Sequence, residues 1–169
     1  MPELRCLGLD CGTSGLRGVV VDCSGTVRAE AHSPFEAGTT DPAVWAAAMD
    51  EVLAELAGHG PIEAVAIDGT SGTLLLTDAA GRPLGAASLY NDTSAAELAA
   101  AILGLAPPES AAHGASSPAA RLKALQALHP EAAHALHQAD WLTFRLTGRL
   151  GLSDDNNALK LGWDPVARI

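Results

Sequence analysis

The sequence predicts an α/β (or α+β) fold, in which helices pack on a mixed β-sheet. Strand patterns dominate the first third of the 169 residues and helical patterns the last third. A strand–helix–strand succession joins these two parts. Apolar residues make up 48% of the chain, which is enough for a core, although many are alanines that contribute little when buried.

The first third is predicted to form a meander of three strands. Leu4–Leu9 is mostly apolar and leads to Asp10, residues 16–21 repeat the strand pattern, and residues 26–31 alternate in polarity. The segments between these runs contain the glycine and serine residues that are typical of turns.

A helix is predicted to begin at Asp41-Pro42, because Asp is a favourable N-cap and Pro suits the first helical position. Apolar residues then recur at helical spacing until glycines 58 and 60 end the pattern: Val44, Trp45, Ala48, Met49, Val52, Leu53 and Leu56.

The central segments are predicted to be extended, and helices follow them. We expect a buried strand over residues 63–67, a strand over residues 73–76, an extended segment over residues 84–90 and a helix over residues 94–103.

The last third begins with an irregular connection over residues 105–117, which is rich in Pro, Ala, Gly and Ser. Helices are then predicted at residues 119–128, 131–137 and 140–146, with a short helix within 153–161.

Charge and cysteine content exclude several classes of function. The net charge of −10 disfavours nucleic-acid and membrane-surface partners, because both are anionic. Three cysteines without a CxxC motif indicate neither a disulfide framework nor a Cys-type zinc site. No signal-peptide or membrane-span pattern is found, so we expect a cytoplasmic protein.

The loop after the first strand is the first candidate site. Gly12, Thr13 and Ser14 could turn backbone N–H groups and hydroxyls toward a transferring phosphoryl group. Asp10 could hold Mg²⁺ through water or accept a hydrogen bond from a substrate hydroxyl. The pattern is neither a Walker A loop nor GxGxxG. A simple hairpin turn is the alternative interpretation.

Residues 67–72 repeat the sequence of this first loop. The hydroxyls of Thr70 and Ser71 could face a polyol, or the segment could again be a hairpin turn. Asn91 and Asp92 could bind sugar hydroxyls or could cap the following helix.

Three further features have structural explanations at least as simple. His134 and His137 are spaced for one helix face, but a polar helix surface explains them better than a metal site. The cluster at 153–157 suits a helix start. The tryptophans at 45, 141 and 163 suit a core or its rim.

Four segments together resemble the N-terminal domain of the FGGY family of carbohydrate kinases. Residues 7–15 resemble the family's first phosphate motif, and residues 64–84 resemble its sugar-side hairpin. Tyr90-Asn91-Asp92-Thr93 is similar to its Trp-Asn-Asp-Thr-Arg segment. Residues 140–148 resemble its Asp-Tyr-Leu…Leu-Thr-Gly segment.

Within that family, residues 136–141 and 153–160 look like the ribulokinase/xylulokinase-like subgroup of cyanobacteria and plants. The resemblance implies that Asp10 and Ser71 lie near a ketopentose and that Thr13 lies near the phosphates. Ser94 replaces an Arg that contacts sugar in many relatives, and the family's catalytic Asp would lie beyond Ile169.

The resemblance implies an actin-like, ribonuclease-H-like lobe with a mixed sheet of about five strands. It also implies ATP and Mg²⁺ as cofactors, and phosphorylation of D-ribulose or D-xylulose by the complete enzyme. Residues 1–169 would then be a partial N-terminal domain that lacks the second, ATP-binding lobe. Alone, the chain should be nearly inactive; it could instead act as a sugar-binding or regulatory fragment, or be a lobe of another actin-like ATPase.

The partners implied by this resemblance are small molecules, namely a sugar and a nucleotide. A homodimer, or a second lobe supplied from elsewhere, is also expected.

Overall fold

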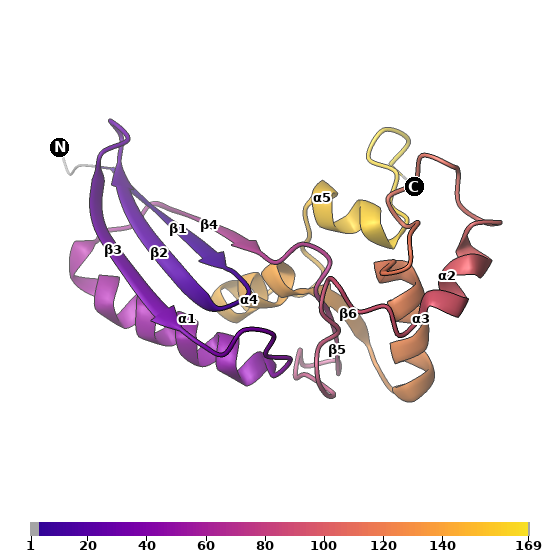
Figure 1. Cartoon of the computed structure of the whole chain (residues 1–169). Helices are drawn as coiled ribbons and strands as arrows, with labels where there is room; N and C mark the ends of the chain where they lie inside the picture. Colours follow the sequence, from indigo (N-terminus) through magenta and orange to yellow (C-terminus); the bar gives the residue numbers. More distant parts are fainter. Residues whose placement is uncertain (1–3, 169) are drawn as a thin grey trace. The chain divides into compact units, whose positions relative to one another are not determined.

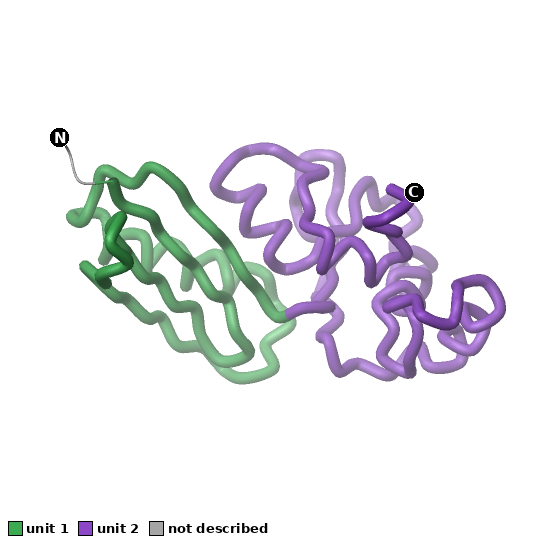
Figure 2. Tube along the Cα trace, turned by 90° about the horizontal axis from the view of Figure 1, so that it is seen from above, with its two compact units in different colours: residues 1–70 green, residues 71–169 purple. Residues whose placement is uncertain are grey.

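The computed structural model describes residues 4–168, which form two compact units (Figure 2). Unit 1 comprises residues 1–70 and unit 2 comprises residues 71–169. Among residues 4–168, no helix has the length and apolar character that crossing a bilayer requires.

Unit 1 is a four-stranded sheet covered by a helix (Figure 1). The strand order is β3-β2-β1-β4; β1 pairs with β2 and β2 with β3 in antiparallel fashion, whereas β1 and β4 are parallel. The elements are β1 (Arg5–Cys11), β2 (Gly15–Asp22), β3 (Val27–Pro34), α1 (Pro42–Leu56), η1 (Ala57–His59) and β4 (Ala64–Gly69). This mixed sheet confirms the predicted α/β class.

Helix α1 begins as its sequence predicts and packs on one face of the sheet. The Asp41 side chain caps it by accepting a hydrogen bond from the Ala43 amide at 2.9 Å. Gly18 of β2 permits close packing, because a Cβ there would lie 2.5 Å from Val52 and 2.7 Å from Leu56. The core between sheet and helix consists of Leu7, Leu9, Leu16, Val20, Ala31, Trp45, Ala48, Met49, Val52 and Leu56.

Strand β4 differs from the buried strand that its sequence predicts. Four of its six residues are exposed, and Val65 keeps 48% of its surface. β4 is the edge of the sheet in the described part of the chain, and it pairs there with β1 alone. Its apolar composition is typical of a parallel strand covered on both faces, but residues 4–168 do not supply that cover.

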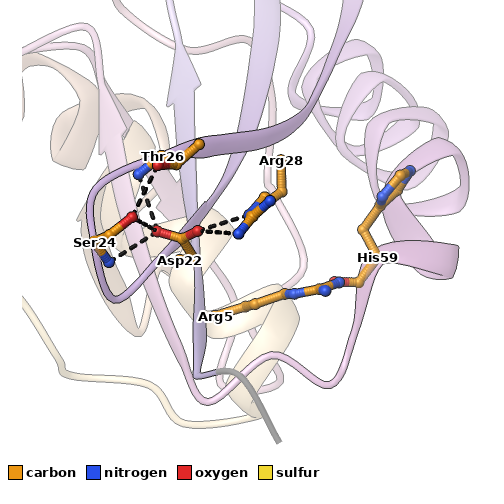
Figure 3. Close-up of polar contacts among 6 residues, drawn as sticks. All are labelled: Arg5, Asp22, Ser24, Thr26, Arg28 and His59. Atoms are coloured by element: carbon orange, nitrogen blue, oxygen red, sulfur yellow. Dashed lines mark hydrogen bonds and ion pairs between the residues drawn. The ribbon is translucent and has the colours of Figure 1, made fainter.

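The turn between β2 and β3 is organised around the buried Asp22 (Figure 3). Its carboxylate accepts hydrogen bonds from the amides of Ser24 and Thr26, from the Ser24 hydroxyl and from Arg28, which also forms an ion pair at 2.6 Å. These hydrogen bonds, that of the Ser24 hydroxyl foremost, lower the pKa of Asp22 to about 2. Nearby, Arg5 donates to the His59 carbonyl at 2.9 Å.

Unit 2 combines a two-stranded sheet with short helices. β5 and β6 pair in antiparallel register, with Leu74 opposite His137. The elements are β5 (Leu74–Thr77), α2 (Ala96–Ile102), α3 (Pro118–Leu128), β6 (His134–His137), α4 (Gln138–Thr147), α5 (Asp155–Ala158) and η2 (Leu159–Leu161). The extended segment predicted at residues 84–90 makes only isolated bridges, such as that between Leu74 and Ser88.

Two sequence predictions are wrong in this unit. The helix predicted at residues 131–137 is largely strand β6, because pairing with β5 outweighs a weak local helical preference. His134 and His137 therefore do not share a helix face. The strand predicted at residues 73–76 lies in this second sheet, so the main sheet has four strands where about five were expected.

Helix α4 packs through its first half and ends where the sequence predicts. Trp141 is buried and donates from its indole nitrogen to the Gly81 carbonyl at 3.1 Å. Gly148 ends the helix in the left-handed conformation, with φ of 67°. Trp45 is likewise buried, whereas Trp163 keeps 36% exposure, so the three tryptophans occupy core and rim as expected.

Candidate functional site

The β1–β2 turn in unit 1 is closed by backbone hydrogen bonds that use its carbonyl groups. The Gly12 amide donates to the Gly15 carbonyl at 3.0 Å. The carbonyls of Thr13 and Ser14 accept from the amides of Gly38 and Phe35, at 3.3 and 3.1 Å. The turn is therefore a true hairpin, which the segment after β3 fixes from one side.

The donors of the same turn remain available. Within residues 4–168, the amides and hydroxyls of Thr13 and Ser14 make no hydrogen bond, and both residues are exposed. A turn whose carbonyls are engaged, and whose N–H groups at Thr13 and Ser14 are not, can bind an anion. The hairpin interpretation and the phosphate interpretation of Gly12, Thr13 and Ser14 are thus compatible.

Asp10 is exposed next to this turn, and its carboxylate makes no hydrogen bond or ion pair within the described residues. It lies in register with Asp68 of the parallel strand β4, so both residues lie next to the last position of their strand, at the carboxyl ends of neighbouring strands. Asp68 uses one oxygen to accept from the Gly69 amide at 2.8 Å. Asp68 was not among the predicted site residues, although the repeat of Leu9-Asp10 as Ile67-Asp68 is a sequence signal for it.

This pair of carboxylates fits a hydrated Mg²⁺ ion. Mg²⁺ is usually held by one or two carboxylates and keeps several waters, so two adjacent exposed Asp side chains suit it. Asp10 and Asp68 are the residues of this chain that would hold the ion. Among residues 4–168, no group of three or more His, Cys, Asp or Glu side chains gathers into a metal site.

Thr70 connects the ends of β4 and β1. Its amide and its hydroxyl both donate to the Cys11 carbonyl, at 3.1 and 3.4 Å. The Cys11 thiol is buried at this junction, and burial, together with the charge of Asp10, raises its pKa to about 12. Thr70 therefore has a structural role, whether or not its oxygen also meets a ligand.

The second Gly-Thr-Ser-Gly loop is not a hairpin, because β4 and β5 belong to different sheets. Gly72 takes a positive φ of 86°, a conformation that favours glycine. Its carbonyl accepts from the guanidinium of Arg121 at 2.6 Å. The hairpin alternative for this loop is therefore wrong. The Arg121 side chain, 49 residues away in sequence, holds the Gly72 carbonyl of the loop.

Arg121, on α3, is a buried hub of unit 2. It is 1% exposed, and besides Gly72 it donates to the Ser88 carbonyl and hydroxyl, each at 2.9 Å, and to the Ser116 carbonyl. The Ser88 hydroxyl in turn donates to Asp92 at 2.7 Å. Sequence reasoning missed Arg121, since a lone Arg in a helical pattern gives no sign that it turns inward.

The Asp92 carboxylate accepts hydrogen bonds from neighbouring groups, whereas Asn91 is exposed. One oxygen of Asp92 accepts from Ser88 and the other from the Ser94 amide at 2.8 Å. Burial raises the pKa of Asp92, but these hydrogen bonds outweigh burial and leave the pKa below its ordinary value. Asp92 does not cap α2, which begins at Ala96, so the capping alternative holds only for the preceding turn.

The cluster at residues 153–157 forms a helix start, as its sequence suggests. Asp154 accepts from the amide and the side chain of Asn157. Ser153 donates to the buried Asp140, whose carboxylate also accepts from the His137 amide. Burial raises the pKa of Asp140 to about 6.

His137 is 2% exposed and lies in the same region. Burial, together with the nearby charge of Lys160, lowers its pKa to about 4, so the ring is neutral at pH 7. Lys160 itself donates to the Ser71 hydroxyl at 2.5 Å.

The predicted site residues divide between the two units. Asp10, Gly12, Thr13, Ser14 and Thr70 gather in unit 1 at the carboxyl ends of β1 and β4. Unit 2 holds Ser71, Asn91 and Asp92, of which Ser71 and Asn91 are exposed.

Comparison with known proteins identifies relatives over nearly the whole chain. Residues 5–163 match the model of the N-terminal domain of the FGGY family of carbohydrate kinases. A xylulose kinase from Streptomyces coelicolor is 31% identical over 176 residues, covering 93% of this chain and 36% of that protein. The chain thus spans about a third of the length of this relative.

Solved structures share the fold. A xylulose kinase from Bifidobacterium adolescentis has a TM-score of 0.84 at 19% identity, covering 100% of this chain and 42% of that one. A Plasmodium falciparum glycerol kinase with ADP has a TM-score of 0.85 at 18% identity, covering 99% of this chain and 39% of that one. The structures confirm the actin-like fold class, and the matching domain shows that this chain belongs to the FGGY family of carbohydrate kinases.

Proposed function

We propose that this chain forms part of an enzyme that transfers the γ-phosphoryl group of ATP to a ketopentose, D-xylulose or D-ribulose. The observation that carries the proposal is the β1–β2 turn, whose carbonyls are engaged while the amides of Thr13 and Ser14 are not. Similarity to the Streptomyces xylulose kinase supports the substrate class. Family membership argues against an actin-like lobe of the chaperone or cytoskeletal class.

The turn would bind the migrating phosphoryl group. Phosphoryl transfer depends mainly on positioning and on charge stabilisation, and backbone N–H groups supply both without side-chain chemistry. Gly12 allows the close approach of a phosphate, and the hydroxyls of Thr13 and Ser14 add donors. A chain of net charge −10 needs such local donors to hold an anion.

Asp10 would orient the attacking sugar hydroxyl or hold Mg²⁺ through water, with Asp68 beside it. When bound, Mg²⁺ would neutralise charge on the phosphate oxygens. The exposure of the Asp10 carboxylate, which makes no hydrogen bond or ion pair among residues 4–168, supports a role toward ligands.

The sugar would contact Ser71 and Asn91 first, because both are exposed polar side chains. Thr70 and Asp92 would contribute less, since each already makes internal hydrogen bonds. The general base and most of the ATP site would come from the portion of the relatives that this chain does not match. We propose a cytoplasmic enzyme, in which a second lobe or a dimer partner completes the site.

A chimeric kinase tests the proposal. The 169-residue chain would replace the matching N-terminal part of the Streptomyces xylulose kinase, and a coupled assay would follow ADP release with D-xylulose and D-ribulose. We expect turnover by the chimera and negligible turnover by the chain alone. Asp10→Asn in the chimera should reduce kcat at least a hundredfold, which is the loss expected for a positioned catalytic group.

Two results would count against the proposal. One is a chimera that unfolds cooperatively and binds ATP but phosphorylates neither ketopentose. The other is an Asp10→Asn chimera with undiminished kcat.

A further inference from the structure

Lys160 makes an unusual contact for a lysine of so acidic a chain. Its ammonium nitrogen lies 2.5 Å from the hydroxyl oxygen of Ser71, across 89 residues of sequence. An ammonium group can only donate, so the Ser71 oxygen must be the acceptor. The identity of the two groups therefore fixes the direction of this hydrogen bond.

This direction leaves the Ser71 proton available. Within residues 4–168, the Ser71 hydroxyl makes no hydrogen bond other than the one from Lys160. A serine hydroxyl has one proton and two lone pairs. With one lone pair occupied by an ammonium, the exposed Ser71 side chain is set up to donate its proton to a ligand.

The Lys160 ammonium forms no ion pair with a carboxylate of the described residues. The chain has a net charge of −10 and only two lysines, Lys123 and Lys160. No carboxylate of the described part lies within 4.0 Å of the Lys160 ammonium, and the nearby His137 ring is neutral at pH 7. Two further ammonium protons therefore remain, beside the Ser71 proton, for an acceptor on a ligand.

We propose that Lys160 determines substrate specificity by making the Ser71 position rich in hydrogen-bond donors, with one acceptor lone pair left, and so selective for the carbonyl oxygen of an open-chain ketose. This inference rests on the proposed function and names the chemical group that the site would select. A carbonyl oxygen only accepts, so it matches such a site. The matching hydroxyl of a pentitol can accept from these donors too, but it also carries a proton, for which Ser71 offers a single remaining lone pair; a pentitol therefore leaves more hydrogen-bonding capacity unsatisfied and should bind more weakly.

The test compares ketoses with pentitols on the chain as it is. Binding of D-xylulose, D-ribulose, xylitol and ribitol would be measured by ligand-observed NMR titration. We expect the ketoses to bind about tenfold more tightly than the pentitols, as one unsatisfied group predicts. Lys160→Met should remove this preference and Lys160→Arg should keep most of it. Lys123→Met, at an exposed position on α3, should change nothing.

A second measurement checks the contact without any sugar. Selective ¹⁵N labelling of the two lysines gives one ammonium signal for each. Ser71→Ala should shift the Lys160 signal and leave the Lys123 signal in place, while circular dichroism confirms that the variant is folded. An unchanged Lys160 signal would overturn the inference.

The outcomes separate this inference from the function on which it rests. If no ketose binds to the wild-type chain at millimolar concentration, this inference fails, whereas the chimera alone decides the proposed function. If ketoses bind and Lys160→Met keeps the full preference over pentitols, only the role of Lys160 fails. A sugar acid that binds more tightly than either ketose, and only when Lys160 is present, would replace the carbonyl by a carboxylate and overturn the ketose assignment.

Discussion

The two Gly-Thr-Ser-Gly loops have nearly the same sequence but are held in different ways. The first turns between two paired strands of one sheet, and neighbouring backbone groups close it. The second leads from one sheet toward another, and a buried guanidinium holds its Gly72 carbonyl. A loop motif therefore specifies its local donors and flexibility, whereas the elements on either side decide how it is supported.

The largest expected effect is the loss of unit 2 stability when the Arg121 guanidinium, which holds the second loop, is removed. Arg121→Met would leave the carbonyls of Gly72, Ser88 and Ser116 without their donor, and should destabilise unit 2 by about 3–5 kcal/mol. Chemical denaturation of ¹⁹F-tryptophan-labelled protein measures this, because Trp45 reports on unit 1 and Trp141 on unit 2. The Trp45 transition should shift less than the Trp141 transition.

Arg149→Met provides the matched control for this experiment. Arg149 is exposed, so its loss should change stability by less than about 0.5 kcal/mol. Equal shifts at Trp45 and Trp141 in Arg121→Met would show that Arg121 does not support unit 2 in particular.

The second prediction concerns pH and unit 2. The pKa of His137 is about 4 when folded and 6.5 ordinarily, so stability falls as pH drops from 6.5 to 4, because the unfolded chain binds the proton first. The pKa of Asp140 is about 6 against 3.8, so stability rises as pH drops from 6 to 3.8. The two effects oppose each other, and the stability of unit 2 should be nearly level between pH 4 and 6.

Asp140→Asn should expose the His137 effect alone. Stability at the Trp141 probe should then fall by about 2–3 kcal/mol between pH 6.5 and 4. Glu109→Gln, an exposed carboxylate replaced in the same way, should leave the profile of the parent. If the stability of Asp140→Asn does not change between pH 6.5 and 4, protonation of His137 does not destabilise the folded state.

The third prediction probes packing in unit 1. Gly18→Ala would place a Cβ 2.5 Å from Val52 and 2.7 Å from Leu56, so α1 must shift away from the sheet at a cost of about 1–3 kcal/mol. Gly8→Ala is the control, because a Cβ at this second mid-strand glycine meets nothing within 4 Å. Thermal unfolding followed at Trp45 should show a lower midpoint for Gly18→Ala alone, and equal midpoints for the two variants would contradict this packing.

The smallest effect is expected for Asp22. Its pKa is lowered to about 2, so its contribution to the stability of unit 1 is present above about pH 4 and is lost as pH falls toward 2. In Asp22→Asn, the stability of unit 1 measured at Trp45 should fall less as the pH drops from 4 to 2. Glu36→Gln, at an exposed position, should lose stability as the parent does. If Asp22→Asn loses stability at low pH as the parent does, other carboxylates cause that loss.

Local signals predicted unit 1 well and unit 2 less well. Helix α1 follows from its N-cap and its periodicity, and the β1–β2 turn lies where its turn residues predict. Strand β6 and the hub at Arg121 depend on partners about 33–63 residues away in sequence, and no local pattern reports them. The exposure of β4 was missed for a related reason: an apolar strand indicates a covered position, but its own residues do not say what covers it.

For the candidate site, the structure adds supporting contacts that the sequence did not indicate, while the ligand roles of the predicted side chains stay predictions. Asp10, Thr13 and Ser14 are exposed, whereas Arg121 and Lys160 emerged only from hydrogen bonds, and Asp68 was recognised through its register with Asp10. A repeat of Leu9-Asp10 in the sequence pointed to Asp68, but nothing in the sequence pairs Lys160 with Ser71.

The placement of the cysteines gives this chain an internal reporter. All three lie in unit 1; Cys6 and Cys23 are exposed, while Cys11 is buried below the β1–β2 turn with its pKa raised to about 12. A thiol reagent at neutral pH will therefore label two sites at once and reach the third only when the base of the turn opens. The rate at which the third label appears thus measures how often the β1–β2 turn comes apart, without any mutation.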